Sequence, residues 1–257
     1  MKGASVVEYE VVGGVARIHL NRPRRLNAVV PELVEGLNAA LDRALEEEVG
    51  AAVLAGRGRA FCSGADLKRR EPPVSEAELR RRMQRVQDVT RRVRRVPFPV
   101  ISAVHGYALG AGCEFALACD LVVAARDAVF GFPEVSVGRG VTGGISHLLP
   151  LAVGPARAKE LVLLGERFGA ERAAELGLVN RVVESGKHEA AALELARRLS
   201  GLPRGAVARA KYALDRGAQS GIETAFEVEV DYAVAARLSE ESERAAEEFR
   251  NRKKEED

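Results

Sequence analysis

Hydrophobic and polar positions repeat with two different periods along the first part of the chain. Short apolar or alternating runs predict strands at residues 6–12, 15–20, 51–55, 100–104, 121–125, 128–131 and 179–183. Gly13-Gly14 separates the first two runs and predicts a two-residue hairpin turn. Leucines at every fourth position predict a helix over residues 31–45. This alternation of strands and helices predicts a layered α/β architecture.

Toward the C-terminus the pattern becomes helical throughout. Helical spacing predicts helices at residues 188–199, 203–216, 222–238 and 240–251. The change predicts a core unit over residues 1–190 and a C-terminal helical region over residues 191–257. One face of the third helix carries a row of apolar side chains that could pack on a neighbouring subunit, namely Ile222, Phe226, Val230 and Val234.

The stretch from Val100 to Asp120 joins a buried strand, a glycine-rich turn and a helix. Three glycines after the strand allow the backbone to approach a ligand closely: Gly106, Gly110 and Gly112. The following helix is apolar except for Glu114, about one turn from its start. A helix start offers unpaired N–H groups and partial positive charge, which suit a developing oxyanion. The alternative interpretation is a buried turn with one satisfied glutamate.

A second strand ends in a similar turn. The run at residues 51–55 leads into Gly58 to Lys68, where glycine again precedes what the pattern predicts to be a helix start. Two backbone N–H groups from separate turns, those of Ala65 and Ala111, can then converge on one oxygen atom.

Three motifs in the chain resemble those of the crotonase superfamily, the enoyl-CoA hydratases and isomerases, in their order and spacing. They are Phe61–Lys68, Gly106–Glu114 and Phe130–Glu134. The resemblance extends from about Val6 to the C-terminal helices. It implies an α/β fold made of a crotonase-like spiral of ββα units with a C-terminal helical region. It is more specific for the superfamily than for the reaction, because one scaffold hosts several chemistries.

The resemblance also implies roles for individual residues. Glu114 is expected to activate water, Glu134 to handle the proton at the α-carbon, and the N–H groups of Ala65 and Ala111 to form an oxyanion hole. The expected activity is that of an enoyl-CoA hydratase, which adds water across the 2,3-double bond of an enoyl-CoA thioester to give 3-hydroxyacyl-CoA. Relatives that only isomerise or decarboxylate often lack one or both glutamates, so this pair favours hydration. The alternatives are an isomerase or lyase of the same fold, or a branched-chain (methylglutaconyl-type) hydratase that binds RNA.

Coenzyme A binding is expected at two segments. By resemblance, the core unit binds it through Ala65, Asp66, Leu67, Lys68 and Ala111. Arg24 and Arg25, on the polar loop after residue 20, are candidates for phosphate contacts because a guanidinium matches phosphate oxygens. The alternative is a solvated basic loop. Asp66 is expected to begin a helix, and the acyl tail to lie near residues 71–83.

Composition removes several other classes of function. The net charge of +2 makes a nucleic-acid partner unlikely on bulk electrostatics. The eight arginines between residues 75 and 96 are interpreted as the solvated face of a helix, since no aromatic residues are interleaved for base stacking. No apolar run approaches the ~20 residues of a membrane helix, so no membrane partner is expected.

Cysteine and histidine usage points to neither a metal nor a redox cofactor. Cys62, Cys113 and Cys119 lack metal-ligand spacing and are interpreted as reduced packing residues. We expect no cofactor other than coenzyme A, which is part of the substrate. The first residues show no hydrophobic signal region, so a cytoplasmic enzyme is expected. Family resemblance implies a homotrimer, or a hexamer made of two trimers.

Overall fold

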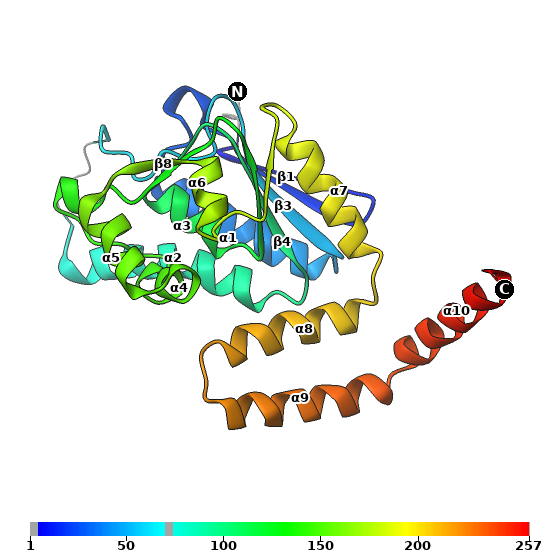
Figure 1. The fold of residues 1–257 in the computed structure, drawn as a ribbon. Coiled ribbons are helices and arrows are strands. Elements are labelled where there is room, and N and C mark those ends of the chain that lie inside the picture. The colour runs from blue at the N-terminus through cyan, green and yellow to red at the C-terminus, as the bar shows by residue number, and fades with distance from the viewer. Residues whose placement is uncertain (1–4, 70–73, 257) are drawn as a thin grey trace.

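A six-stranded sheet forms the centre of the body in the computed structural model, which describes residues 5–69 and 74–256 (Figure 1). Its strand order is β1-β2-β3-β4-β6-β9, with β1 antiparallel to β2 and the remaining neighbours parallel. Its strands are β1 (Val7–Val12), β2 (Val15–Leu20), β3 (Ala51–Gly56), β4 (Val100–Val104), β6 (Leu121–Ala125) and β9 (Arg181–Val183). The predicted mixed α/β architecture is therefore correct.

The described helices agree closely with the sequence pattern. They are α1 (Pro31–Glu46), α2 (Glu76–Arg95), α3 (Ala111–Ala118), α4 (Ile145–Val153), α5 (Pro155–Leu164), α6 (Ala170–Glu175), α7 (His188–Ser200), α8 (Arg204–Gly217), α9 (Ile222–Arg237) and α10 (Glu240–Glu256), with short 3-10 turns η1 (Pro23–Arg25) and η2 (Val135–Val137). No helix among these described residues is long and apolar enough to cross a bilayer.

The hairpin between β1 and β2 forms as predicted. Val12 pairs with Val15, and both intervening glycines have positive φ, 60° at Gly13 and 76° at Gly14. A two-residue hairpin turn of this hand needs positive φ at both positions, which glycine adopts without strain.

Helices cover both faces of the large sheet, which explains its continuous apolar strands. Alternate residues of β3 point to opposite sides: Ala52 and Leu54 join the larger core cluster beneath α1, while Ala51 and Val53 join a smaller cluster. The smaller cluster is completed by α7 through Ala192, Leu193, Leu195 and Ala196. Helix α7 therefore packs as part of the body, and the boundary predicted between residues 190 and 191 falls within this helix.

A second, three-stranded sheet contains the strand predicted at residues 128–131, while its other two strands lie where the sequence pattern indicated a turn and a short connecting element. It is ordered β5-β7-β8 and consists of β5 (Tyr107–Leu109), β7 (Val129–Gly131) and β8 (Arg167–Gly169). Strands of three residues are too short to show a period of two. The stretch after Gly106 is therefore a strand before it is a turn.

The apolar stripes of α1 and α2 both continue beyond the core. Leu33, Leu37 and Leu41 of α1 are buried, but Leu45 is 46% exposed. In α2 the C-terminal half packs inward, whereas Leu79 and Met83 are exposed. Helical spacing gives the direction of a side chain, while the reach of the neighbouring elements decides whether anything covers it.

Candidate active site

The glycine-rich segments after β3 and β4 run side by side. Cys62 donates its N–H to the carbonyl of Tyr107 at 2.8 Å and accepts from the N–H of Leu109 at 3.0 Å, forming a parallel bridge opposite Ala108. Ala65 follows Cys62 by the same number of positions as Ala111 follows Ala108. The register therefore leads both alanines toward the same end of the paired segments.

Two glycines allow these segments to meet just before the alanines. Gly64 and Gly110 both have positive φ, 83° and 53°. A Cβ atom on Gly64 would lie 2.7 Å from the carbonyl oxygen of Leu109 and 3.6 Å from the Cα atom of Gly110. Any larger residue would force the turns apart, so this approach requires glycine.

The N–H groups of Ala65 and Ala111 have no acceptor among the hydrogen bonds of the described residues. Val29 bridges to the first segment by donating to Gly64 and accepting from Asp66, which turns the N–H of Ala65 to the other side. Ala111 is the first residue of α3, where an N–H has no partner within the helix. Both groups can therefore donate to a ligand.

The predicted helix start after Gly64 is wrong. Residues 67–69 form a turn and a bend. The following helix, α2, begins only at Glu76, and its N-cap residue, Ser75, accepts a hydrogen bond from the N–H of Glu78. Asp66 instead accepts from the N–H of Lys68 at 3.2 Å, a local bond that closes a turn. Thus one candidate donor lies at a helix start and the other lies in a turn.

Glu114 is held inside the body, with 1% of its surface exposed. Its Oε1 accepts from the N–H of Thr142 and its Oε2 from the Thr142 hydroxyl, both at 2.5 Å. Burial raises the pKa of Glu114, and the two bonds from Thr142 oppose that rise. The carboxylate is desolvated and fixed in direction.

Glu134 has a contrasting environment. It follows Pro133 after β7, is 9% exposed, and its Oε2 is buried without a partner in the part of the chain that the structure describes. A Cβ on Gly110 would lie 2.8 Å from its Oε1, so the carboxylate rests against the turn that carries Ala111. Burial, reinforced by the nearby charge of Glu114, raises the pKa of Glu134 to about 7.

Thr142 is the site residue that the sequence analysis missed. Thr142 lies in a glycine-rich passage at residues 138–144 that belongs to none of the three motifs, yet this passage contacts Glu114 closely. A Cβ on Gly143 would lie 2.9 Å from the Cβ of Glu114. Because Thr142 and Glu114 are distant in sequence and form no recognisable motif, only the fold brings them together.

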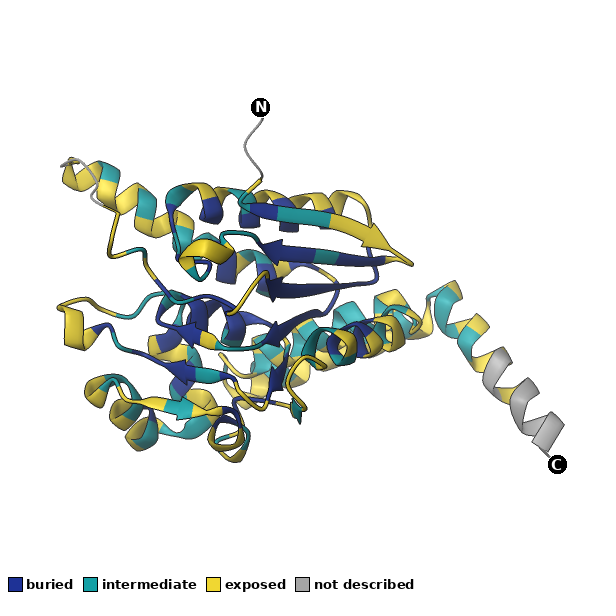
Figure 2. Cartoon of the chain, turned by 90° about the horizontal axis from the view of Figure 1, so that it is seen from above, coloured by how far each residue is buried: buried dark blue, intermediate teal, exposed yellow. Residues whose placement is uncertain are grey.

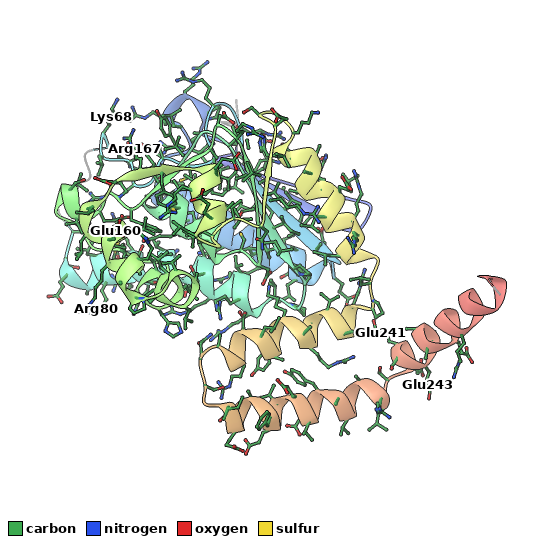
Figure 3. The ribbon with its side chains drawn as sticks, in the orientation of Figure 1. Lys68, Arg80, Glu160, Arg167, Glu241 and Glu243 are labelled. Carbon is green, nitrogen blue, oxygen red and sulfur yellow. The ribbon has the colours of Figure 1, made fainter. Side chains whose placement is uncertain are left out.

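The expected coenzyme A residues lie at the surface beside the first turn. Leu67 and Lys68 are exposed, and Lys68 stands at the edge of the body (Figure 3). Asp66 forms ion pairs with Arg22 at 3.1 Å and with Arg25 at 3.5 Å. Burial alone would raise the pKa of Asp66, but the two guanidinium groups hold it below its ordinary value. Arg25 therefore braces this segment through its ion pair with Asp66, while Arg24 is exposed.

Asn27 fastens the arginine loop to the first glycine-rich segment. It is fully buried, and its Nδ2 donates to the carbonyls of Ala60 at 2.8 Å and Arg57 at 2.9 Å. Its positive φ of 54° suits asparagine better than most residues. The loop that carries Arg24 and Arg25 is thus positioned by a buried side chain.

The cysteines are packing residues, as expected. All three are free and buried, and burial raises the pKa of Cys62 to about 12, so its thiol stays protonated at neutral pH. Among the residues described, no group of three or more His, Cys, Asp or Glu side chains is placed to hold a metal ion.

Solved structures with this architecture belong to the crotonase superfamily, which is the class of protein that the fold and the paired turns define. A putative enoyl-CoA hydratase from Streptomyces coelicolor A3(2) superposes with a TM-score of 0.92, at 34% identity over 98% of this chain and 94% of that one. The chain belongs to the enoyl-CoA hydratase/isomerase family, whose model matches residues 10–256.

Two curated relatives show the range of names within this family. The mitochondrial enoyl-CoA hydratase domain-containing protein 2 of Bos taurus is 39% identical over 222 residues, 84% of this chain and 75% of that protein. The 1,2-epoxyphenylacetyl-CoA isomerase of Escherichia coli K12 is 35% identical over 223 residues, 85% of each chain. Family membership therefore supports chemistry on acyl-CoA thioesters and leaves hydration to be argued from the site.

Proposed function

We propose that this protein is an enoyl-CoA hydratase that converts a 2,3-enoyl-CoA into the 3-hydroxyacyl-CoA. The observation that carries the proposal is the pair of buried glutamates with unequal environments beside two N–H groups that have no acceptor among the described residues. Hydration needs a base for water, an acid for the α-carbon and donors for the thioester oxygen. The four groups present match these three tasks.

The proposed reaction conserves every proton. The N–H groups of Ala65 and Ala111 stabilise negative charge on the thioester oxygen as the water oxygen bonds to the β-carbon. Glu114 accepts the proton that this water loses, and Glu134 donates a proton to the α-carbon. Transfer of a proton from Glu114 back to Glu134 restores the starting state, so no oxidant or reductant is consumed.

The unequal environments support this division of roles. Glu114 accepts two hydrogen bonds from Thr142, which favour its ionised form. Within the described ranges Glu134 has no hydrogen-bond partner at Oε2, and its pKa of about 7 leaves much of it protonated at neutral pH. A base is best ionised and an acid best protonated before substrate arrives.

Coenzyme A is proposed to bind along the segment from Ala65 to Lys68. The exposed backbone there can meet the pantetheine, and Arg24, Arg25 and Lys68 supply positive charge for phosphates. Since Arg25 already pairs with Asp66, its use by a phosphate would require that 3.5 Å contact to loosen. No separate cofactor takes part in the proposed reaction.

Loss of the enoyl thioester absorbance tests the proposal. Purified protein is incubated with short, long and branched 2-enoyl-CoAs, and the product is identified by mass. We expect the absorbance to fall and the mass to increase by one water. Unchanged absorbance with all three classes would contradict hydration.

An isomerase or lyase is the second candidate, favoured by the isomerase among the relatives. The same assay separates the reactions, because isomerisation leaves the mass unchanged and a lyase splits the acyl chain. A branched-chain hydratase would prefer the branched substrate.

RNA binding receives little support from α2. Seven of its eight arginines have acidic partners within the described residues: Arg80, Arg81, Arg82, Arg85, Arg91, Arg92 and Arg94. Their charge is largely compensated locally, which weakens attraction to a phosphate backbone. A salt-sensitive affinity for RNA without thioester turnover would reverse this conclusion.

We further propose a homotrimer or hexamer. The third C-terminal helix, α9, exposes Ile222, Phe226, Val230 and Val234 by more than half of their surfaces. A second copy of the chain is the partner proposed for this row. A cytoplasmic location stays a prediction, since the similar Bos taurus protein is mitochondrial by name.

A further inference from the structure

We propose that Thr142 is a positioning residue that keeps Glu114 ionised and aimed at the substrate, and thereby assigns the base role to Glu114 and the acid role to Glu134. The inference rests on the proposed hydratase function. It goes beyond that function by identifying, outside the recognised motifs, the residue that separates the two carboxylates.

The first support is the geometry of the two bonds. Thr142 donates its N–H to one oxygen of Glu114 and its hydroxyl to the other, at 2.5 Å each. Two donors from one residue fix both the position and the rotation of the carboxylate. A carboxylate has about four acceptor sites, so the remaining ones can hold a water molecule.

The second support is that Thr142 is itself held in place. The next residue, Gly143, is buried and packs against Glu114, and its φ of 57° favours glycine. Thr90 of α2 donates its hydroxyl to the carbonyl of Gly143 at 3.0 Å within the core. The donors on Thr142 are therefore preorganised by a helix on one side and by tight packing on the other.

The third support is that no compensating positive charge acts on Glu114 among the residues that the structure describes. The titratable groups that interact with it are Glu134, from the loop after β7, and the buried thiols of Cys62 and Cys113. Burial raises the pKa of Glu114, and the opposing influence comes from the side chain and the backbone of Thr142. Glu134, without such a partner, keeps its proton to higher pH.

The hydroxyl also suits the reaction after proton uptake. A backbone N–H can only donate, so it favours ionised Glu114 throughout. A hydroxyl can donate to the carboxylate and then rotate to accept from the carboxylic acid. The Thr142 hydroxyl can therefore stay hydrogen-bonded to Glu114 in both protonation states by rotating its O–H bond, without a shift of the backbone.

Three variants test this role. Thr142→Val keeps the shape and the N–H but removes the hydroxyl, Thr142→Ser retains the hydroxyl, and Thr90→Val removes a neighbouring buried hydroxyl that does not touch Glu114. Their kcat/KM values are measured with an enoyl-CoA from pH 5 to pH 9. In parallel, proteins labelled with carbon-13 at the glutamate carboxyl carbon are titrated without substrate, and the Glu114 signal is identified by its loss in Glu114→Gln.

We expect the acid limb of the Thr142→Val profile to move to higher pH, lowering kcat/KM at pH 6 by about tenfold while much of the activity returns at pH 8. The Glu114 signal should titrate at correspondingly higher pH. Thr142→Ser is the matched control and should resemble the wild type. Thr90→Val, which removes the hydrogen bond that holds the carbonyl of Gly143, should move the acid limb in the same direction as Thr142→Val but by less. If Thr142→Val does not fold, Thr142→Ala carries the same expectations.

Two results would overturn the inference. One is a Glu114 titration that is unchanged in the variant lacking the hydroxyl. The other is a loss of activity by the same factor at every pH, which would indicate a merely structural role. If the wild type fails to hydrate any enoyl-CoA, the proposed function fails, and the carbon-13 titration still decides whether Thr142 controls the proton on Glu114.

Discussion

Large apolar side chains are buried in the body and exposed on the C-terminal helices (Figure 2). In the body, Phe61, Phe115 and Phe130 are fully buried. In α9, by contrast, Phe226 is 51% exposed and Val230 63%, and neither α8 nor α9 contains a buried residue. Figure 1 shows α8 and α9 lying beside the body, with α10 extending away from both.

The attachment of the helices is largely polar. Lys211 of α8 donates to the carbonyls of Val93 and Phe98, at 2.6 and 3.0 Å, and pairs with Asp120 at 2.8 Å. The body buries its own core and contains all of the candidate site residues. From this contrast we expect the body to determine the chemistry and the C-terminal helices to determine the assembly.

The largest effect is expected from the two glutamates. Glu114→Gln and Glu134→Gln should each reduce kcat by about 10²–10⁴-fold, because each removes one proton-transfer group while keeping the side-chain shape. Both variants should still bind acyl-CoA, measured by calorimetry, and keep the wild-type assembly. Normal turnover in either variant would remove that residue from the mechanism.

A slightly smaller effect should follow from removal of one oxyanion donor. Ala111→Pro deletes the N–H, which should cost about 10²–10³-fold in kcat. Proline is well tolerated at the first position of a helix, so α3 should still form, and circular dichroism checks this. Ala111→Ser keeps the donor and is the matched control; equal losses in the two variants would point to crowding instead.

Changes in α9 should alter assembly more than chemistry. Phe226→Asp combined with Val230→Asp places two charges in the exposed apolar row, and light scattering should report a smaller species than the wild type. Glu229→Gln, on the same helix and also exposed, is the control. If the double variant dissociates and also loses as much activity as Glu114→Gln, the C-terminal helices are needed for catalysis as well as for assembly.

The smallest expected effect is the pH dependence that the raised pKa of Glu134 gives to the free energy of unfolding. Because the folded-state pKa of Glu134 is raised to about 7 from 4.5, the native protein holds an extra proton between these values, and its stability falls as pH rises through them. Glutamine does not titrate. The free energy of unfolding of Glu134→Gln, relative to wild type, should therefore increase by about 1–2 kcal/mol from pH 5 to pH 8, with solvent near the site keeping it below the full linkage value. A pH-independent difference in urea unfolding would argue against the raised pKa.

Local pattern was sufficient for much of the fold and for the principal candidate residues. The Gly13-Gly14 hairpin follows from two adjacent residues, and the helices follow from a spacing that repeats within one element. Glu114 and Glu134 became candidates because each lies in a short motif that resembles one of the crotonase superfamily. These features depend on neighbours in sequence, so a single chain displays them.

Tertiary structure decided which of those groups are covered, paired or left alone. The sheet of β5, β7 and β8 exists only through pairing between distant three-residue strands, and Leu45 is exposed because its helix runs past the core. Thr142 donates to Glu114 from a distant loop, while Oε2 of Glu134 has no hydrogen-bond partner in the described part of the chain. Sequence determined which groups are available and which way they point; long-range packing determined their surroundings, and burial and hydrogen bonding then set the proton affinity of each carboxylate.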